Sequence, residues 1–96
     1  MENSKKLIRL GVNDNVLVLP VNANIGDVFT FENVRYKIRE NLTLGHKIAS
    51  KDIAKNEKII KYNVSIGSAV SDIKKGEHVH IHNIKSDFIA THTADN

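Results

Sequence analysis

The chain has 96 residues, of which 41% are hydrophobic and 5% aromatic, and its 14 basic and 11 acidic residues leave a formal charge of +3. This length allows one small domain with an aliphatic core and excludes a complete doubly wound or barrel enzyme. The absence of cysteine excludes disulfides, thiolate nucleophiles and cysteine-ligated zinc or iron–sulfur sites. The basic excess is small and mixed with acidic residues, so we expect no nucleic-acid partner.

The N-terminal segment lacks the apolar core of a secretory signal, and the longest apolar runs, such as residues 16–19, are too short to span a bilayer. We therefore expect a cytoplasmic domain with no membrane partner. Residues 6–87 are predicted to form the domain, with polar tails at 1–5 and 88–96.

Along the chain the apolar pattern is short and mostly alternating, which is typical of strands. Strands are predicted at 16–19, 28–31 and 34–38, with a tight turn at Glu32-Asn33 between the last two. Residues 50–54 are predicted to form one helical or 3₁₀ turn. No segment keeps a 3.6-residue apolar period over the length of a stable helix. The predicted fold is therefore all-β, a small barrel or sandwich with short helical turns.

One internal repeat is visible at a constant shift. Residues 52–59 align with residues 72–79, and Asn63 then falls on Asn83. Two copies are too few for a solenoid and predict a pseudo-symmetric β-domain, although chance similarity is an alternative because Lys, Ile and Glu are common here. The aspartate that opens each copy is interpreted as a cap of a short turn.

The strongest local motif is the sequence EHVHIHN near the end of the chain. If it forms a strand, Val79 and Ile81 point into the core while His78, His80 and His82 share the opposite face. Imidazoles on one strand face can bind a metal ion or act as general acids and bases near neutral pH. The alternative interpretation is a solvated polar face on an amphipathic strand.

Two further positions place cations beside polar or apolar segments. Gly45 permits a tight turn that presents His46 as an acid/base group and Lys47 as a cation for a carboxylate. Lys61 lies on the strand that the repeat makes equivalent to the histidine strand, where it could face an anionic ligand. The alternatives are a plain hairpin turn at the first position and a lysine snorkelling from a strand edge at the second.

Taken together, seven motifs follow one another along the chain: Gly45-His46-Lys47, Asp52-Ile53-Ala54, Ile60-Lys61-Tyr62, Ile66-Gly67, Asp72-Ile73, Gly76-Glu77 and Val79-His80-Ile81-His82-Asn83. This series resembles the small SAF-type domain of the altronate/galactarate dehydratase family, which also includes the small subunit of sulfolactate sulfo-lyase. The resemblance covers nearly the whole chain. This sequence departs from the family where Tyr62 is followed by Asn63 instead of glycine, and where Asn56 occupies a turn that often holds glycine.

The resemblance implies a β-clip-like fold and β-elimination of water or sulfite from a sugar acid or related 2-hydroxy acid. It also implies a divalent metal such as iron or manganese and a large catalytic subunit as partner, while self-association into a homo-oligomer is left open. The motifs assign catalysis to His46, His80 and His82, substrate binding to Lys47, Lys61 and Asn83, and metal binding to His80 and His82. His78 shares the predicted face but is not part of the motif. The alternative function is a non-enzymatic SAF-type module that binds carbohydrate or metal.

Overall fold

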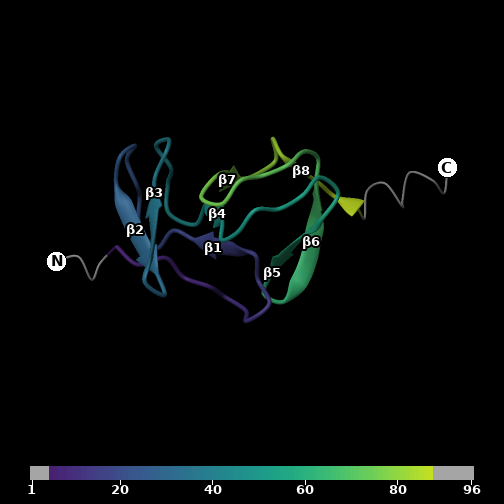
Figure 1. Cartoon of the computed structure of the whole chain (residues 1–96), viewed down its shortest axis with the longest axis horizontal. Helices are drawn as coiled ribbons and strands as arrows, with labels where there is room; N and C mark the ends of the chain where they lie inside the picture. Colours follow the sequence, from purple (N-terminus) through teal and green to yellow (C-terminus); the bar gives the residue numbers. More distant parts are fainter. Residues whose placement is uncertain (1–4, 88–96) are drawn as a thin grey trace.

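The computed structural model describes residues 5–87, which form eight short strands in three antiparallel sheets (Figure 1). Of the predicted tails at 1–5 and 88–96, all residues except Lys5 lie outside the described residues. The strands are β1 (Val16–Val18), β2 (Val28–Phe31), β3 (Val34–Lys37), β4 (Lys47–Ala49), β5 (Lys58–Lys61), β6 (Val64–Ala69), β7 (His78–Val79) and β8 (Ile84–Lys85). Sheet β1-β4-β7 lies between sheet β2-β3 and sheet β5-β6-β8.

The prediction of an all-β fold is confirmed, but the helical turn predicted at 50–54 is wrong. Ile53 is instead extended and exchanges two backbone hydrogen bonds with Ile73, each 2.7 Å long. Both side chains are buried, and a helical turn would remove these backbone groups from each other's reach. Within residues 5–87 there is no helix long and apolar enough to cross a membrane.

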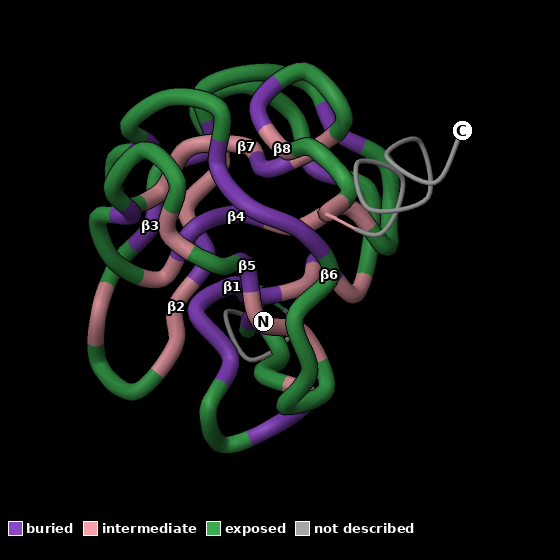
Figure 2. Tube along the Cα trace, turned by 90° about the vertical axis from the view of Figure 1, so that its right-hand side faces the viewer, coloured by how far each residue is buried: buried purple, intermediate pink, exposed green. Residues whose placement is uncertain are grey.

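The central sheet is covered on both faces, which explains why such short strands are stable. Leu17 on β1 and Ile48 on β4 belong to the core shared with sheet β2-β3, whereas Val16 and Ala49 belong to the core shared with sheet β5-β6-β8. Because side chains alternate between the two faces of a strand, successive residues of β1 and β4 pack into two different cores. Figure 2 shows the same result as continuous buried stretches along β1 and β4.

Four turn segments share one local pattern, an Asn or Asp, a buried apolar residue, two variable residues, a residue with positive φ and a closing polar residue. The segments form two pairs. The first pair is residues 22–27 and 41–46, and the second pair is residues 52–57 and 72–77. The positive-φ positions are Gly26 (93°), Gly45 (90°), Asn56 (75°) and Gly76 (89°). Asn56 thus adopts the left-handed conformation that glycine adopts in the other three segments.

The two segments of each pair bind one another around a local two-fold axis. In the first pair Ala23 and Leu42 exchange backbone hydrogen bonds of 2.8 and 2.9 Å, as Ile53 and Ile73 do in the second. The side chain of each opening Asn or Asp accepts a hydrogen bond from a backbone amide of the other segment, at 2.8–2.9 Å in all four cases. The opening aspartates of the sequence repeat are therefore turn caps, and each caps its partner's turn.

The closing residue of the turn is a carboxylate in three of the four segments. Asp27, Glu57 and Glu77 each accept a hydrogen bond from the backbone amide three residues earlier, at 2.8, 2.9 and 2.7 Å. His46 occupies this position in the fourth segment. The repeat between the two segments of the first pair is not recognisable in the sequence, because both open with Asn instead of Asp and because histidine replaces one closing acid.

A buried carboxylate ties the start of the chain to the β5–β6 hairpin. Asp14 accepts hydrogen bonds from the backbone amides of Gly11 (2.9 Å), Tyr62 (3.0 Å) and Asn63 (2.8 Å). Burial raises the pKa of Asp14, but these hydrogen bonds and the charge of Arg9 outweigh it, so the pKa is lowered overall. The ionised carboxylate therefore stabilises the fold.

The substitution Asp14→Asn is expected to lower the free energy of unfolding at pH 7 by about 2 kcal/mol, because hydrogen bonds to a charged acceptor are lost. The contribution of the native carboxylate is present above the unfolded-state pKa of about 3.9 and is lost as the pH falls through the lowered folded-state pKa. Urea denaturation of both proteins from pH 7 down to about pH 2 measures this. A stability difference that stays constant over the whole range would contradict the interpretation.

Candidate functional site

The pairing of β4 with β7 brings two histidines together. In the register of these strands Lys47 lies opposite Val79, and Ile48 lies opposite His78. His46, the closing residue of its turn, directly precedes β4. Its Nδ1 lies 2.9 Å from Nε2 of His78, and both side chains are half-buried. The departure from the turn pattern therefore places an imidazole where it meets a second imidazole.

A third histidine completes a group that can hold a metal ion. The ring of His80 lies 4.9 Å from that of His46 and 5.4 Å from that of His78, measured between centroids. One ligand atom from each of the three lies within 4.8 Å of the other two. Neighbouring ligands of a tetrahedral ion with metal–nitrogen bonds of about 2.1 Å lie about 3.4 Å apart, so the three side chains would need to move together by about 1 Å to share one ion. We call His46, His78 and His80 the histidine trio.

The strand predicted through His82 is wrong, because β7 ends at Val79 and residues 80–83 form a turn. The side chain of Asn83 closes this turn: its Oδ1 accepts a hydrogen bond from the amide of His80 (2.9 Å), and its Nδ2 donates one to the carbonyl of His78 (2.8 Å). Ile81, predicted to face the core, is consequently 81% exposed. Asn83, predicted to bind substrate, thus has both ends of its amide engaged in shaping the histidine turn.

His82 lies beside the trio and not within it. Its ring centroid is 5.3 Å from that of His78, and its side chain is exposed. The sequence prediction paired His80 with His82 as metal ligands, whereas the structure groups His80 with His46 and His78. His78, which the sequence motif left out, contacts the rings of His46, His80 and His82.

The surroundings of His78 and His80 favour neutral imidazoles. Burial lowers the pKa of His78, and the other histidines lower it further against the opposing effect of Glu40. Burial also lowers the pKa of His80, followed by the charges of His46 and Lys47. Neutral imidazole is the form that binds a metal ion, so both shifts keep these two side chains ready for one near pH 7.

Lys47 and Lys61, both predicted to bind substrate, lie close enough to influence one another. Burial lowers the pKa of Lys47, and the charge of Lys61 lowers it further. Within residues 5–87, neither ammonium group has a carboxylate within 4.0 Å. Lys47 also acts electrostatically on His80. Lys47 lies beside His80, and Lys61 lies near Lys47; since neither is ion-paired within residues 5–87, these two half-buried cations form an arrangement that can bind an anion.

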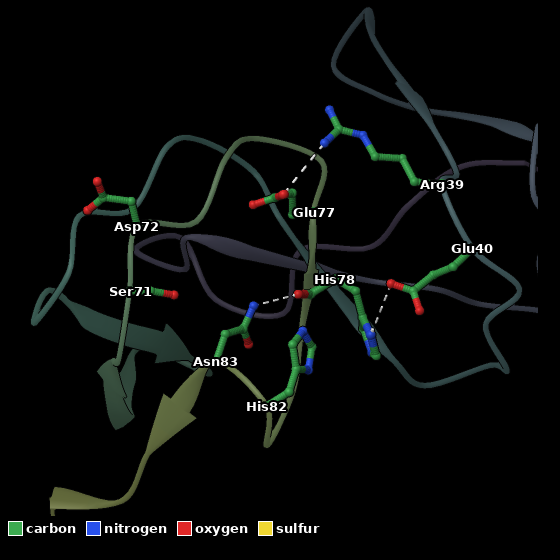
Figure 3. Close-up of a pocket in the computed structure, with 8 residues that line it drawn as sticks. All are labelled: Arg39, Glu40, Ser71, Asp72, Glu77, His78, His82 and Asn83. Atoms are coloured by element: carbon green, nitrogen blue, oxygen red, sulfur yellow. Dashed lines mark hydrogen bonds and ion pairs between the residues drawn. The ribbon is translucent and has the colours of Figure 1, made fainter.

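A cavity of about 370 Å³ adjoins the trio on the side of His78 (Figure 3). It is lined by Arg39, Glu40, Ser71, Asp72, Glu77, His78, His82 and Asn83. In Figure 3 the carboxylate of Glu40 points toward the ring of His78, with Oε2 3.7 Å from Nδ1. Arg39 pairs with Glu77 across the cavity at 3.8 Å. The cavity therefore places carboxylates on one side of the trio, while Lys47 provides a cation beside His80.

Sequence reasoning found His46 and His80 but missed the central position of His78 and the contact with Glu40. The four-fold turn pattern holds a signal for His46, because a histidine replaces a closing acid only there. Glu40 carries no such signal, since its contact with His78 depends on how the segment after β3 lies against β7.

Comparison with known proteins identifies relatives of this chain. Residues 5–87 match the sequence model of the altronate/galactarate dehydratase SAF domain. The chain is 43% identical over 53 residues to the (2R)-sulfolactate sulfo-lyase subunit alpha of Chromohalobacter salexigens, an alignment that covers 55% of this chain and 56% of that protein. It is 37% identical over 82 residues to altronate dehydratase of Bacillus subtilis, covering 85% of this chain and 16% of that protein. The altronate dehydratase of Escherichia coli gives 38% identity over 79 residues, which cover 82% of this chain and 16% of that protein. The chain thus spans about half of the first relative and a small part of the two dehydratases.

Proposed function

The chain belongs to the altronate/galactarate dehydratase SAF domain family, as its motifs predicted, and on this premise we propose that it is the small component of a metal-dependent sugar-acid dehydratase or related sulfo-lyase. The reaction is a β-elimination in which water or sulfite leaves a 2-hydroxy acid. A larger subunit completes the active site, as the name "subunit alpha" of a relative supports.

The observation that carries this proposal is the histidine trio beside the Lys47–Lys61 pair. The ligand atoms of the trio lie within 4.8 Å of one another, and Lys47 acts directly on His80. Elimination next to a carboxylate requires a cationic site for that carboxylate, a group that moves a proton, and an electrophile. The residue types of this site match all three requirements.

His46, His78 and His80 would hold the ion, and a divalent iron or manganese ion would supply Lewis acidity when bound. Lys47 and Lys61 bind the carboxylate and stabilise the negative charge that develops on it as the neighbouring carbon loses its proton. His82 lies outside the trio with an exposed ring 5.3 Å from His78, so its imidazole nitrogen remains available to accept or return a proton.

The test is reconstitution of the full chain with a dehydratase-type large subunit from the same genome. The complex is loaded with Fe²⁺ or Mn²⁺ and screened against hexonates and sulfolactate, with detection of the 2-keto product or of sulfite. We expect elimination only when both proteins are present. Metal bound by the chain without turnover of any of these acids by the complex would instead favour the alternative, a metal-binding module.

In the same assay, Lys47→Gln is expected to raise the KM for the acid by about tenfold or more, because a charge-assisted contact with the carboxylate is lost. Lys37→Gln is the matched control, since Lys37 is exposed on β3 in a different sheet. Equal KM values for the two variants would remove Lys47 from the substrate site.

A further inference from the structure

Glu40 occupies a special position among the acidic residues of the domain. Its Oε2 lies 3.7 Å from Nδ1 of His78, and within residues 5–87 no other carboxylate lies within 4.0 Å of a histidine nitrogen. The Glu40 side chain is 58% exposed, whereas that of His78 is 10% exposed. The exposed carboxylate thus lies directly beside a largely buried ring, and both line the cavity in Figure 3.

The two nitrogens of His78 face different partners. The negative charge of the Glu40 carboxylate, 3.7 Å from Nδ1, attracts an N–H and repels a lone pair, so Glu40 favours the hydrogen on Nδ1 and leaves the lone pair on Nε2. Nε2 is the nitrogen that lies 2.9 Å from Nδ1 of His46. In the metal-free chain, His46 then donates from its Nδ1 to this lone pair. Nε2 is therefore the atom that His78 offers to the trio.

We propose that Glu40 is a positioning residue that holds His78 in the Nδ1–H tautomer and keeps its Nε2 directed at the metal site. This inference rests on the metal site of the proposed function and adds a residue outside the three ligands. A carboxylate behind a ligating histidine fixes both its tautomer and its ring orientation, and loss of such a partner typically costs 10–100-fold in metal affinity.

Within residues 5–87, the contact with His78 is the one close polar contact of the Glu40 side chain, so its substitution tests that contact alone. Its neighbour Arg39 pairs with Glu77 and also contacts the carbonyl of Lys75, whereas Glu40 is involved in the contact with His78. Substitution of this exposed side chain is therefore expected to leave the melting temperature unchanged within about 2 °C.

The experiment uses the full 96-residue chain without a partner. Co²⁺ is titrated into the unsubstituted chain, Glu40→Gln and Glu32→Gln, and binding is followed by visible absorption and calorimetry. Glu32 is the matched control because its carboxylate is also exposed and ion-paired, with Arg9, but lies in the β2–β3 turn. We expect a Kd about 10–100-fold higher for Glu40→Gln and an unchanged Kd for Glu32→Gln.

A second readout does not depend on metal. Long-range ¹H–¹⁵N spectra of the metal-free chain, assigned with His78→Ala, should show the Nδ1–H tautomer of His78, and Glu40→Gln should shift it toward Nε2–H. Unsubstituted affinity in Glu40→Gln, or an Nε2–H tautomer in the unsubstituted chain, overturns the proposal. If the unsubstituted chain does not bind Co²⁺, the metal site of the proposed function fails, and the tautomer spectra alone decide the role of Glu40.

Discussion

Replacing His78 by Ala is expected to abolish metal loading and turnover together. The ring of His78 contacts those of His46, His80 and His82, and one of its nitrogens is among the three clustered ligand atoms. Loss of one ligand of three should weaken the binding of Co²⁺ or Fe²⁺ by more than about 100-fold, the upper range for losing only a partner of a ligand. Metal analysis of the purified chain and calorimetry measure the loss, and the melting temperature shows whether the variant remains folded.

The matched control is His82→Ala, because His82 lies in the same turn but outside the trio. It should retain metal affinity within about threefold while turnover of the reconstituted enzyme falls by about 100-fold, the effect of losing a proton-transfer group. The sequence motif predicts a different pair, His80 and His82, as the ligands. If His82→Ala loses the metal and His78→Ala keeps it, the motif-based pair is correct and the trio is not the metal site.

The largest expected effect on stability comes from Gly67→Ala in β6. Gly67 has a φ of 151°, which side-chain-bearing residues rarely adopt, and an added Cβ would overlap the carbonyl oxygen of Lys85 on β8. Backbone strain and overpacking each cost about 1–3 kcal/mol, so we expect a loss of about 3 kcal/mol or more. For a domain of this size that corresponds to a melting temperature lower by about 12 °C or more.

Gly26→Ala separates the clash from the strain. Gly26 also has a positive φ, 93°, but a Cβ added there would meet no atom within 4 Å. Gly26→Ala should lower the free energy of unfolding by only about 1 kcal/mol, which is the effect of the left-handed conformation alone. Thermal denaturation of both variants makes the comparison, and equal losses would show that β8 can move away from β6 freely.

Sequence patterns predicted the strands well, because alternation reports directly on which side chains are buried. The strands predicted at 28–31 and 34–38 and the turn Glu32-Asn33 agree closely with β2, β3 and their positive-φ turn. The prediction for residues 50–54 was wrong because a five-residue segment with only Ile53 and Ala54 as apolar residues is too short to show a periodicity. Its conformation is set by a partner segment twenty residues away, through the Ile53–Ile73 bridge.

The candidate site could be predicted only in part, for a similar reason. Alternation predicted that His78, His80 and His82 share one face of a strand, but the strand ends at Val79, where Asn83 binds the backbone of the following turn. His46 was found through its glycine and lysine neighbours. Its contact with His78 follows from the β4–β7 register, which pairs residues about thirty positions apart and leaves no trace in local sequence.

The closing position of the four turns has a consequence for how such a domain acquires new chemistry. Each turn is held by backbone hydrogen bonds to its partner and by the opening Asn or Asp, so the closing acids of three segments add a hydrogen bond that the fourth segment lacks. His46 shows that this one position can change its side chain while the scaffold persists. The domain thus has four equivalent closing positions. Substituting the side chain at Asp27, Glu57 or Glu77 is the way to introduce a second site while the fold is kept.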